Sequence, residues 1–450
     1  MTTIAAISTP VGVGGIGIVR ISGTKALEII QKVFQPINKS QYCSYHMKFG
    51  YIVSEDGTIL DQALVSYFKA PKTYTGEDVC EINCHGGTLS MKKVLELVLE
   101  NGAELAEPGE FTKRAFMNGK MDLTQAEAVM ELINSKSEKE NKASLKQLEG
   151  VLGRKVRKIK QSIVDLLVDI EANIDYPEYD IEEVRREKMI TVLQENIQCL
   201  QKLEESFNSG KVLREGVLTA IVGKPNVGKS SLLNRLVKEE RAIVTEIAGT
   251  TRDTIEEFIT IKGIPIKLVD TAGIHETKDL VEEIGVNKSK KVLQEAELVL
   301  MMLDATVPLS QEDEALLDAV KEKKHIIIIN KIDIGKTLNA KMFLDHPVIE
   351  ISAKTMEGME QLEEKIEELF HISDMEIENA VMITNIRHKE LITKAKQGLI
   401  EAKNAVESNV PIDMISINLQ ESIQNLGEMT GESISEDILK GIFAKFCVGK

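Results

Sequence analysis

The segment from Gly223 to Ser230, GKPNVGKS, constrains the fold more than any other part of this 450-residue chain. Its two glycines allow backbone N–H groups to turn inward around the α- and β-phosphates of a nucleotide. Lys229 can then reach the β- and γ-phosphates, and the Ser230 hydroxyl can ligate Mg²⁺. The apolar run 217–222 before the loop predicts a buried strand, and residues 231–236 have helical spacing. The segment therefore predicts a strand, a phosphate-binding loop and a helix.

Three further motifs follow strand-like apolar runs in the order that a guanine-nucleotide site requires. The carboxylate in Asp270-Thr271-Ala272-Gly273 can hold Mg²⁺ through water, and the glycine N–H can sense the γ-phosphate. The aspartate in Asn330-Lys331-Ile332-Asp333 can accept two hydrogen bonds from guanine that adenine does not offer, so it rejects the wrong base. Ser352-Ala353-Lys354 supports the same base. Together the motifs predict a GTP-binding α/β unit with a doubly wound, mostly parallel sheet.

The segment Thr250-Thr251-Arg252-Asp253 bears on hydrolysis. Thr251 is the expected switch residue for Mg²⁺ and the γ-phosphate. Many small GTPases place a water-orienting Gln directly after the Asp-x-x-Gly motif, but this chain has Ile274, which cannot orient water. Another group must therefore organise hydrolysis, and the nearby carboxylates are Glu276, Glu282 and Glu283. Arg252 has two open interpretations, an arginine finger supplied in cis or a structural ion pair.

The chain is too long for a single hydrophobic core, and its pattern of apolar and polar residues changes along the sequence. Residues 1–118 mix β-branched runs with turns and short helices, which predicts an α+β domain. Residues 119–212 and 373–450 have apolar residues three and four positions apart, which predicts long helices. Residues 213–372 hold the nucleotide motifs. We expect a helical domain interrupted by an inserted GTPase domain, because neither helical half obviously buries its apolar stripe alone.

Composition sets limits on the location of the protein. No apolar stretch reaches transmembrane length, and the first residues lack the basic region of a secretion signal. Five cysteines at irregular spacing favour reduced thiols over a disulfide framework. We therefore expect a cytoplasmic protein that makes no use of a membrane.

The formal net charge of −16 argues against a broad surface for nucleic acid, so any RNA contact is expected to be local. The chain has no Trp, which argues against sequence-independent binding of single strands by stacking. One basic cluster lies on a predicted helix and has two interpretations, a local RNA contact or a solvated face paired with neighbouring acids. Its members are Arg154, Lys155, Arg157, Lys158 and Lys160.

A group of cysteines and histidines in the N-terminal region also has two interpretations. Cys80, Cys84 and His85, with Cys43 and His46 upstream, fit a zinc site. Cys80 and Cys84 also alternate onto one face of a predicted strand, where a small buried Cys is common. The second interpretation needs no metal.

The C-terminal residues Phe446 to Lys450 follow a predicted helix. They fit an ordinary frayed helix end. They fit equally a mobile tail whose Cys447 thiol and Lys450 ammonium reach into the site of another domain.

Several motifs lie outside the nucleotide site. They are Thr9-Pro10, GGIGIVRISG at 14–23, YTGED at 74–78, His85-Gly86-Gly87, PGEFTKRAF at 108–116, KMDLTQAEA at 120–128, and CVGK at 447–450. With these motifs and the inserted GTPase unit, the chain resembles the MnmE/TrmE family of tRNA modification GTPases along its whole length. One departure is Val448, where Ile or Leu is frequent.

The resemblance implies that the N-terminal domain is similar to folate-dependent one-carbon enzymes. It implies a homodimer formed through this domain, which binds 5-formyltetrahydrofolate or 5,10-methylenetetrahydrofolate. The implied folate contacts are Arg20, Glu77, Lys120 and Lys450, and Cys447 is a candidate for the modification chemistry.

The resemblance also implies that GTPase domains pair across the dimer and that K⁺ takes the place of an arginine finger. The implied ligands are Asn226, Thr245, Ile247 and Thr250 for K⁺, and Ser230 and Thr251 for Mg²⁺. The expected catalytic residues are Lys229, Thr251 and Glu282, with Glu282 orienting the water. The full set of expected nucleotide contacts is Asn226, Val227, Gly228, Lys229, Ser230, Ser231, Thr245, Glu246, Ile247, Ala248, Gly249, Thr250, Thr251, Asp270, Thr271, Ala272, Gly273, Asn330, Lys331, Asp333, Ser352, Ala353 and Lys354.

By the same resemblance, the activity is GTP hydrolysis coupled to tRNA modification. With an FAD-dependent partner of the MnmG/GidA family in a hetero-oligomer, the family adds a carboxymethylaminomethyl or aminomethyl group to C5 of the wobble uridine of certain tRNAs. Folate supplies the methylene carbon. The rival interpretation is a ribosome-assembly or signalling GTPase that binds RNA as a switch. The absence of a KH-type module or an arginine-rich tail, and the Cys447 terminus, favour the modifying enzyme.

Overall fold

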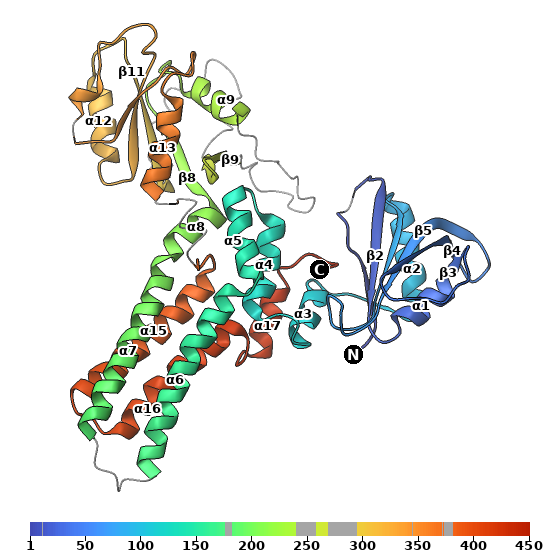
Figure 1. Cartoon of the computed structure of the whole chain (residues 1–450). Coiled ribbons are helices and arrows are strands. Elements are labelled where there is room, and N and C mark those ends of the chain that lie inside the picture. The colour runs from blue at the N-terminus through green and yellow to red at the C-terminus, as the bar shows by residue number, and fades with distance from the viewer. Residues whose placement is uncertain are drawn as a thin grey trace. The chain divides into compact units, whose positions relative to one another are not determined.

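The computed structural model describes residues 1–10, 12–175, 182–239, 258–268, 295–343, 345–370, 372 and 381–450 (Figure 1). The chain forms two compact units. The first comprises Met1–Met130, Gln147–Asp180 and Val410–Lys450, and the second comprises Glu131–Lys146 and Ile181–Asn409. The division into residues 1–118, 119–212, 213–372 and 373–450 stays a prediction.

The first unit contains a seven-stranded sheet with the order β3-β4-β5-β6-β2-β1-β7, in which only the β1–β7 pair is parallel. Helices α1 (Ala26–Val33) and α2 (Thr88–Glu100) pack on one face (Figure 1). Period-two alternation sends Val19, Ile21, Cys80, Ile82 and Cys84 into this core. The strands are β1 (Ile4–Ile7), β2 (Ile16–Ser22), β3 (Phe34–Pro36), β4 (His46–Val53), β5 (Ile59–Phe68), β6 (Val79–His85) and β7 (Glu104–Leu105).

The helices of the first unit come from both ends of the predicted helical domain. Helix α6 (Val151–Asp175) packs along α16 (Ile412–Thr430) (Figure 1). A small core joins the start of α4 (Leu123–Asn134) to α17 (Glu436–Phe443), through Leu123, Leu439 and Phe443 among others. Helix α3 (Glu110–Met117) precedes α4. Segments far apart in the sequence thus share one core, because each buries its apolar stripe against the other.

The second unit repeats this arrangement with other helices. Helix α7 (Glu182–Glu205) packs along α15 (Ile386–Glu407), and Glu204 accepts hydrogen bonds from Thr393 and Lys396 across that interface. Helix α5 (Glu138–Leu148) begins in this unit, and α8 (Phe207–Glu215) leads into its sheet.

That sheet has six strands in the order β13-β12-β11-β8-β10-β9, and all neighbours are parallel except β9 and β10. Strand β11 is buried along almost its whole length because both faces of the sheet are covered. The strands are β8 (Val217–Val222), β9 (Phe258–Ile261), β10 (Ile264–Leu268), β11 (Leu298–Asp304), β12 (His325–Asn330) and β13 (Val348–Glu350). A short 3-10 helix, η1, spans Ala340–Met342.

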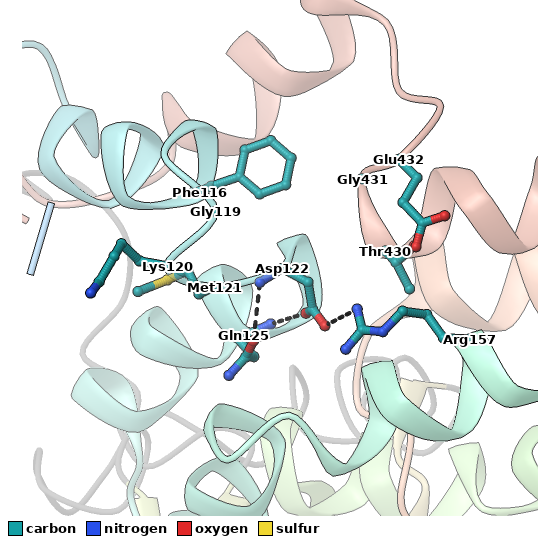
Figure 2. A pocket seen from close by; sticks show the side chains of 10 residues that line it. All are labelled: Phe116, Gly119, Lys120, Met121, Asp122, Gln125, Arg157, Thr430, Gly431 and Glu432. Atoms are coloured by element: carbon teal, nitrogen blue, oxygen red, sulfur yellow. Dashed lines mark hydrogen bonds and ion pairs between the residues drawn. The ribbon is translucent and has the colours of Figure 1, made fainter. Parts of the chain in front are cut away.

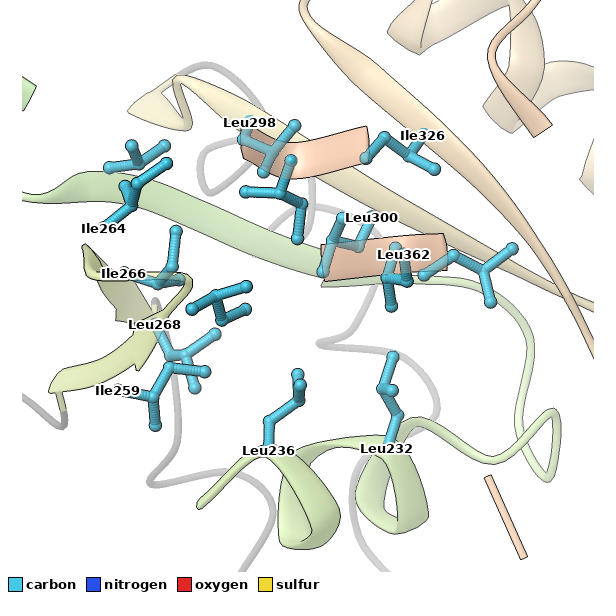
Figure 3. Packing of buried hydrophobic residues seen from close by; sticks show 14 of the residues in the cluster. Leu232, Leu236, Ile259, Ile264, Ile266, Leu268, Leu298, Leu300, Ile326 and Leu362 are labelled. Carbon is cyan, nitrogen blue, oxygen red and sulfur yellow. The ribbon is translucent and has the colours of Figure 1, made fainter. Parts of the chain in front are cut away.

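The two faces of this sheet have separate cores. Figure 3 shows Leu232 and Leu236 of α9 (Lys229–Glu239) and Leu362 of α13 (Met359–Phe370) gathered with strand residues such as Leu300. The opposite core contains Val320 of α12 (Gln311–Val320). The predicted fold class is confirmed: an N-terminal α+β part, a helical part and a P-loop α/β part with a doubly wound, mostly parallel sheet. In the described part of the chain, no helix combines the length and apolar character needed to cross a membrane.

Candidate functional site

The phosphate-binding loop connects β8 to α9, as the sequence predicts. Its backbone has positive φ angles at Gly223 (145°), Asn226 (66°) and Gly228 (105°). A Cβ atom at Gly228 would lie 2.2 Å from Nδ2 of Asn330, and one at Gly223 would lie 2.4 Å from the carbonyl oxygen of Met302. Glycine is therefore required at both positions, by conformation and by space.

The ammonium group of Lys229 lies inside this loop. It donates to the carbonyl oxygens of Gly223 at 2.6 Å and Lys224 at 2.7 Å. Burial lowers the pKa of Lys229, because removal from water disfavours the charged form. The loop thus holds a desolvated cation at the start of α9, where a helix N-terminus also favours an anion.

Asn330 joins three of the predicted motifs. Its side chain, only 3% exposed, donates from Nδ2 to the carbonyl oxygen of Val227 at 2.8 Å. Its Oδ1 accepts from the backbone N–H of Ala353 at 3.0 Å. Because one buried amide bonds both to the phosphate loop and to the loop after β13, the three segments form a single site at the carboxyl ends of parallel strands.

The predicted base-recognition residues lie together at the same edge. Ser352 Oγ donates to Oδ1 of Asp333 at 2.7 Å and accepts from the backbone N–H of Thr355 at 3.1 Å. Lys331 Nζ donates to Oδ2 of Asp304 at 2.6 Å. Ser352 therefore orients the carboxylate of Asp333. Because Asp333 is exposed, this carboxylate is also open to a ligand. Ser230, Ser231 and Lys354 are also exposed.

The remaining expected nucleotide and cation residues lie outside the described residues. This holds for the segment around the expected switch threonine and for the segment that contains the expected catalytic carboxylate. The residues are Thr245, Glu246, Ile247, Ala248, Gly249, Thr250, Thr251, Arg252, Asp270, Thr271, Ala272, Gly273, Ile274, Glu276, Glu282 and Glu283.

The first unit contains a second candidate site, a cavity of about 330 Å³ that brings Arg20 and Lys450 together. Arg20 Nη1 donates to the carbonyl oxygen of Gly449 at 3.2 Å, and Ser8 Oγ donates to the same oxygen at 3.1 Å. Burial and the neighbouring Arg20 lower the pKa of the Lys450 ammonium. The lining residues are Arg20, Tyr45, Phe68, Lys72, Thr73, Tyr74, Val79, Glu81 and Lys450.

Glu77, another expected folate contact, does not line this cavity. It forms an ion pair with Arg114 at 3.1 Å, in which the two side chains are 15% and 5% exposed. It also accepts from Ser22 Oγ at 2.8 Å, and Arg114 pairs in turn with Glu110 at 2.7 Å. In this structure Glu77 belongs to a nearly buried ionic network.

Lys120 lines a different cavity of about 440 Å³ in the first unit. Its ammonium donates to the carbonyl oxygen of Pro71 at 3.0 Å, directly before Lys72 of the Arg20 cavity. Figure 2 shows Asp122 in the centre of the Lys120 cavity, with Gln125 on one side and Arg157 on the other. Arg157 pairs with Asp122 at 2.8 Å.

Three members of the basic cluster have partners within the structure. Arg157 pairs with Asp122, Lys160 pairs with Glu432, and Arg154 donates to the carbonyl oxygen of Glu149 at 2.7 Å. These contacts favour the interpretation of the cluster as a paired helix face.

The cysteines near the N-terminus face the core of the sheet. Cys80 and Cys84 are 0% and 4% exposed, which confirms their predicted burial on one strand face. His85 Nδ1 instead contacts Asp61 at 2.5 Å. No group of three or more candidate metal ligands occurs in the described parts of the chain.

Two family models together match nearly the whole chain. The N-terminal model, described as "GTP-binding protein TrmE N-terminus", matches residues 3–120, and the model described as "MnmE helical domain" matches residues 123–447. The "tRNA modification GTPase MnmE" of Lactobacillus gasseri is 46% identical over 452 residues, covering 100% of this chain and 98% of that protein. The chain belongs to the MnmE/TrmE family. A relative with the same description from Thermoanaerobacter pseudethanolicus is 48% identical over 456 residues and covers 100% of this chain and 99% of its own length.

Among solved structures, the G domain of the T. maritima FeoB iron transporter is similar to 34% of this MnmE/TrmE-family chain and matches over 98% of its own length. Its sequence identity is 30% and its TM-score is 0.25. A likeness of this extent carries no argument about function.

Sequence reasoning on this MnmE/TrmE-family chain missed Glu81, Lys72 and Tyr74 as lining residues of the Arg20 cavity. Glu81 lies directly opposite Arg20 in the antiparallel β2–β6 pair. An Arg and a Glu on different strands give no signal in the sequence until the register of the two strands is known. Tyr74 belongs to a motif that carried the family resemblance, so that motif was the available signal.

Proposed function

We propose that this MnmE/TrmE-family GTPase hydrolyses GTP in a K⁺-dependent manner and, with an FAD-dependent partner of the MnmG/GidA family, modifies certain tRNAs in the cytoplasm. The product is a carboxymethylaminomethyl or aminomethyl group on C5 of the wobble uridine, position 34. The observation that carries the proposal is the Arg20 cavity in the first unit, which residues from both ends of the chain line. The second unit contains the phosphate loop with Lys229.

The described residues have clear tasks in GTP binding. Lys229 neutralises the β- and γ-phosphates from inside the loop, where desolvation strengthens its interaction with an anion. Asp333, held by Ser352, accepts the two donors of the guanine edge. Asn330 keeps the phosphate loop and the base-recognition loop in register, so the nucleotide is bound at both ends in one orientation.

Two cations are part of the proposal. The exposed Ser230 hydroxyl at the start of α9 suits Mg²⁺, together with Thr251. The exposed Asn226 amide suits K⁺, together with Thr245, Ile247 and Thr250. A bound cation beside the β- and γ-phosphates supplies positive charge where negative charge develops. Glu282 then orients the attacking water in place of the missing Gln.

The Arg20 cavity is the proposed site for 5-formyltetrahydrofolate or 5,10-methylenetetrahydrofolate. Lys72 and Lys450 provide positive charge for the carboxylates of a folate, and Tyr45, Phe68 and Tyr74 provide apolar walls for its rings. Cys447, an exposed free thiol on the same tail, is the proposed participant in the modification chemistry.

The open face of the N-terminal sheet supports a homodimer through this domain. Met47, Phe49 and Leu64 are 56%, 47% and 42% exposed, and Phe49 pairs with Leu64 in the β4–β5 register. The cross-strand row that begins with Met47 continues through Ser66 to Glu81 and Arg20. A second copy on this face would shield both the apolar side chains and the cavity from water.

Reconstitution tests the proposal directly. The purified protein is combined with its MnmG/GidA-type partner, tRNA, GTP, K⁺, an amine donor and 5,10-methylenetetrahydrofolate, and nucleosides are analysed by mass spectrometry. We expect modified uridine at position 34 that disappears when folate or GTP is omitted. If the protein carries no folate after purification and the full mixture leaves the tRNA unmodified, the rival assignment to an RNA-binding switch GTPase is favoured.

A further inference from the structure

The second position of the phosphate loop is Lys224, a position to which the general loop pattern assigns no role. In the structure the Lys224 ammonium lies 2.5 Å from Oδ2 of Asp313. The two side chains are 23% and 6% exposed, so the pair is largely removed from water. Because an unpaired buried carboxylate is costly, Asp313 holds the Lys224 side chain in place.

Asp313 is itself fixed at the start of α12. Its Oδ2 atom also accepts from the backbone N–H and from Oγ of Ser310, each at 3.0 Å. Ser310 precedes the helix and Asp313 is the third residue within it, so the two form a capping box. Helix α12 packs through Val320 in the core on the face of the sheet opposite α9. Asp313 therefore provides a rigid anchor for the loop on that face.

The backbone of Lys224 contacts the group that binds phosphate. Its carbonyl oxygen accepts from Nζ of Lys229 at 2.7 Å, and the carbonyl oxygen of Gly223 accepts from the same ammonium at 2.6 Å. Pro225 follows directly, and its ring restricts the rotation of the chain at that position. An anchored side chain at Lys224 thus restrains the part of the loop that orients Lys229.

We propose that the ion pair between Lys224 and Asp313 positions the phosphate loop for the β-phosphate of the nucleotide. Lys224 is a positioning residue, because its ammonium contacts α12 and acts on the nucleotide through the loop backbone. Without the pair the loop populates other conformations, and the apparent affinity for the nucleotide falls with the fraction that is competent to bind. The inference needs only nucleotide binding and depends on neither the K⁺ nor the folate part of the proposed function.

Displacement of a fluorescent GDP from the full-length protein by GDP and by GMP tests the inference, since GMP lacks the β-phosphate. We expect Lys224→Gln and Asp313→Asn each to weaken GDP binding by about tenfold, and GMP binding by less than about threefold. The amide in Asp313→Asn still offers an oxygen to Ser310, so the start of α12 is kept. Lys224→Arg should retain the wild-type affinity because it keeps the charge. Asp318→Asn, 81% exposed on the same helix, is the matched control.

The double variant Lys224→Gln/Asp313→Asn decides how Lys224 acts. It should lose no more GDP affinity than either single variant, because each single change already breaks the pair. It also removes the unpaired buried carboxylate, so it remains informative if Lys224→Gln alone fails to fold. Wild-type GDP affinity in Asp313→Asn overturns the inference, and so does an equal loss of GDP and GMP binding. A double variant that binds GDP far more weakly than Asp313→Asn would show that Lys224 contacts the phosphates itself, which also overturns it.

Discussion

Arg20 and Gly449 lie 429 residues apart in the sequence, and Nη1 of Arg20 donates to the carbonyl oxygen of Gly449 at 3.2 Å. Gly449 has φ of 91°, and a Cβ there would lie 2.3 Å from the carbonyl oxygen of Ile7. Farther back along the tail, the backbone N–H of Gly109 donates to the carbonyl oxygen of Cys447 at 3.3 Å. Through these contacts the tail packs against the N-terminal part of the first unit. They favour the interpretation in which the tail contributes residues to a site over the interpretation of a frayed helix end.

Deletion of Cys447 to Lys450 should weaken binding of 5-formyltetrahydrofolate by about tenfold or more, because Lys450 and the Gly449 carbonyl are lost from the cavity. The deletion should also abolish tRNA modification, because it removes Cys447. GTP hydrolysis in K⁺ should remain, since the phosphate loop is untouched. Cys447→Ser is the control that separates the thiol from the tail: it should keep folate affinity while modification falls. Normal modification by the truncated protein would restore the frayed-end interpretation.

GTP turnover should rise strongly when K⁺ replaces Na⁺ at constant ionic strength. The reason is that Ile274 stands where many small GTPases have a water-orienting Gln, so the proposed mechanism depends on a bound K⁺. Asn226→Ala should flatten this difference by removing an amide ligand. Asn226 has φ of 66°, so Asn226→Gly is the better matched variant: it loses the amide without the left-handed strain that Ala adds. Phosphate release in the two salts is the measurement, and equal wild-type rates would refute the K⁺ mechanism.

Asp333→Asn should weaken GTP binding by roughly 10²-fold, because the amide cannot accept both donors of the guanine edge. Xanthosine triphosphate should gain affinity relative to GTP, since its C2 carbonyl can accept from the new amide. Competition with a fluorescent nucleotide measures both effects. Asp345→Asn, in an exposed loop, should change neither affinity. Unchanged GTP binding in Asp333→Asn would remove this residue from the base site.

Glu282→Ala should lower the GTP hydrolysis rate by about 10² or more with nearly unchanged GTP affinity, as expected for a water-positioning group. Single-turnover kinetics and nucleotide titration separate the two quantities. Glu283→Ala serves as the neighbouring control. Greater damage from that variant would show that the assigned position is wrong by one residue.

Glu140→Gln should stabilise the protein at alkaline pH. Burial raises the pKa of Glu140 to about 7 from 4.5. Between these values the unfolded chain releases a proton that the folded chain retains, so wild-type stability falls as pH rises through this window. The melting temperature of the variant should therefore exceed that of the wild type more at pH 8 than at pH 5. Glu138→Gln, exposed on the same helix, should show no such pH-dependent gain.

The P-loop part of the protein could be predicted from local sequence. Strands β8, β10, β12 and β13 lie within one or two residues of the apolar runs that predicted them, because buried parallel strands require continuous apolar stretches. The order of the motifs then placed Asp333 and Ser352 at one edge, and the structure joins them by a hydrogen bond. Each motif directly follows its own strand-forming run, so each could be recognised from local sequence without knowledge of long-range pairing.

From the sequence, only the family resemblance implied that Arg20 and Lys450 contact one folate, and that assignment stays a prediction. Only the tertiary structure decided that Glu81 lines the cavity with them and that Glu77 pairs with Arg114. The reason is physical. Strand register and the seating of a chain end depend on packing between segments far apart in the sequence, and a shift of one residue in β6 would send Glu81 to the opposite face of the sheet.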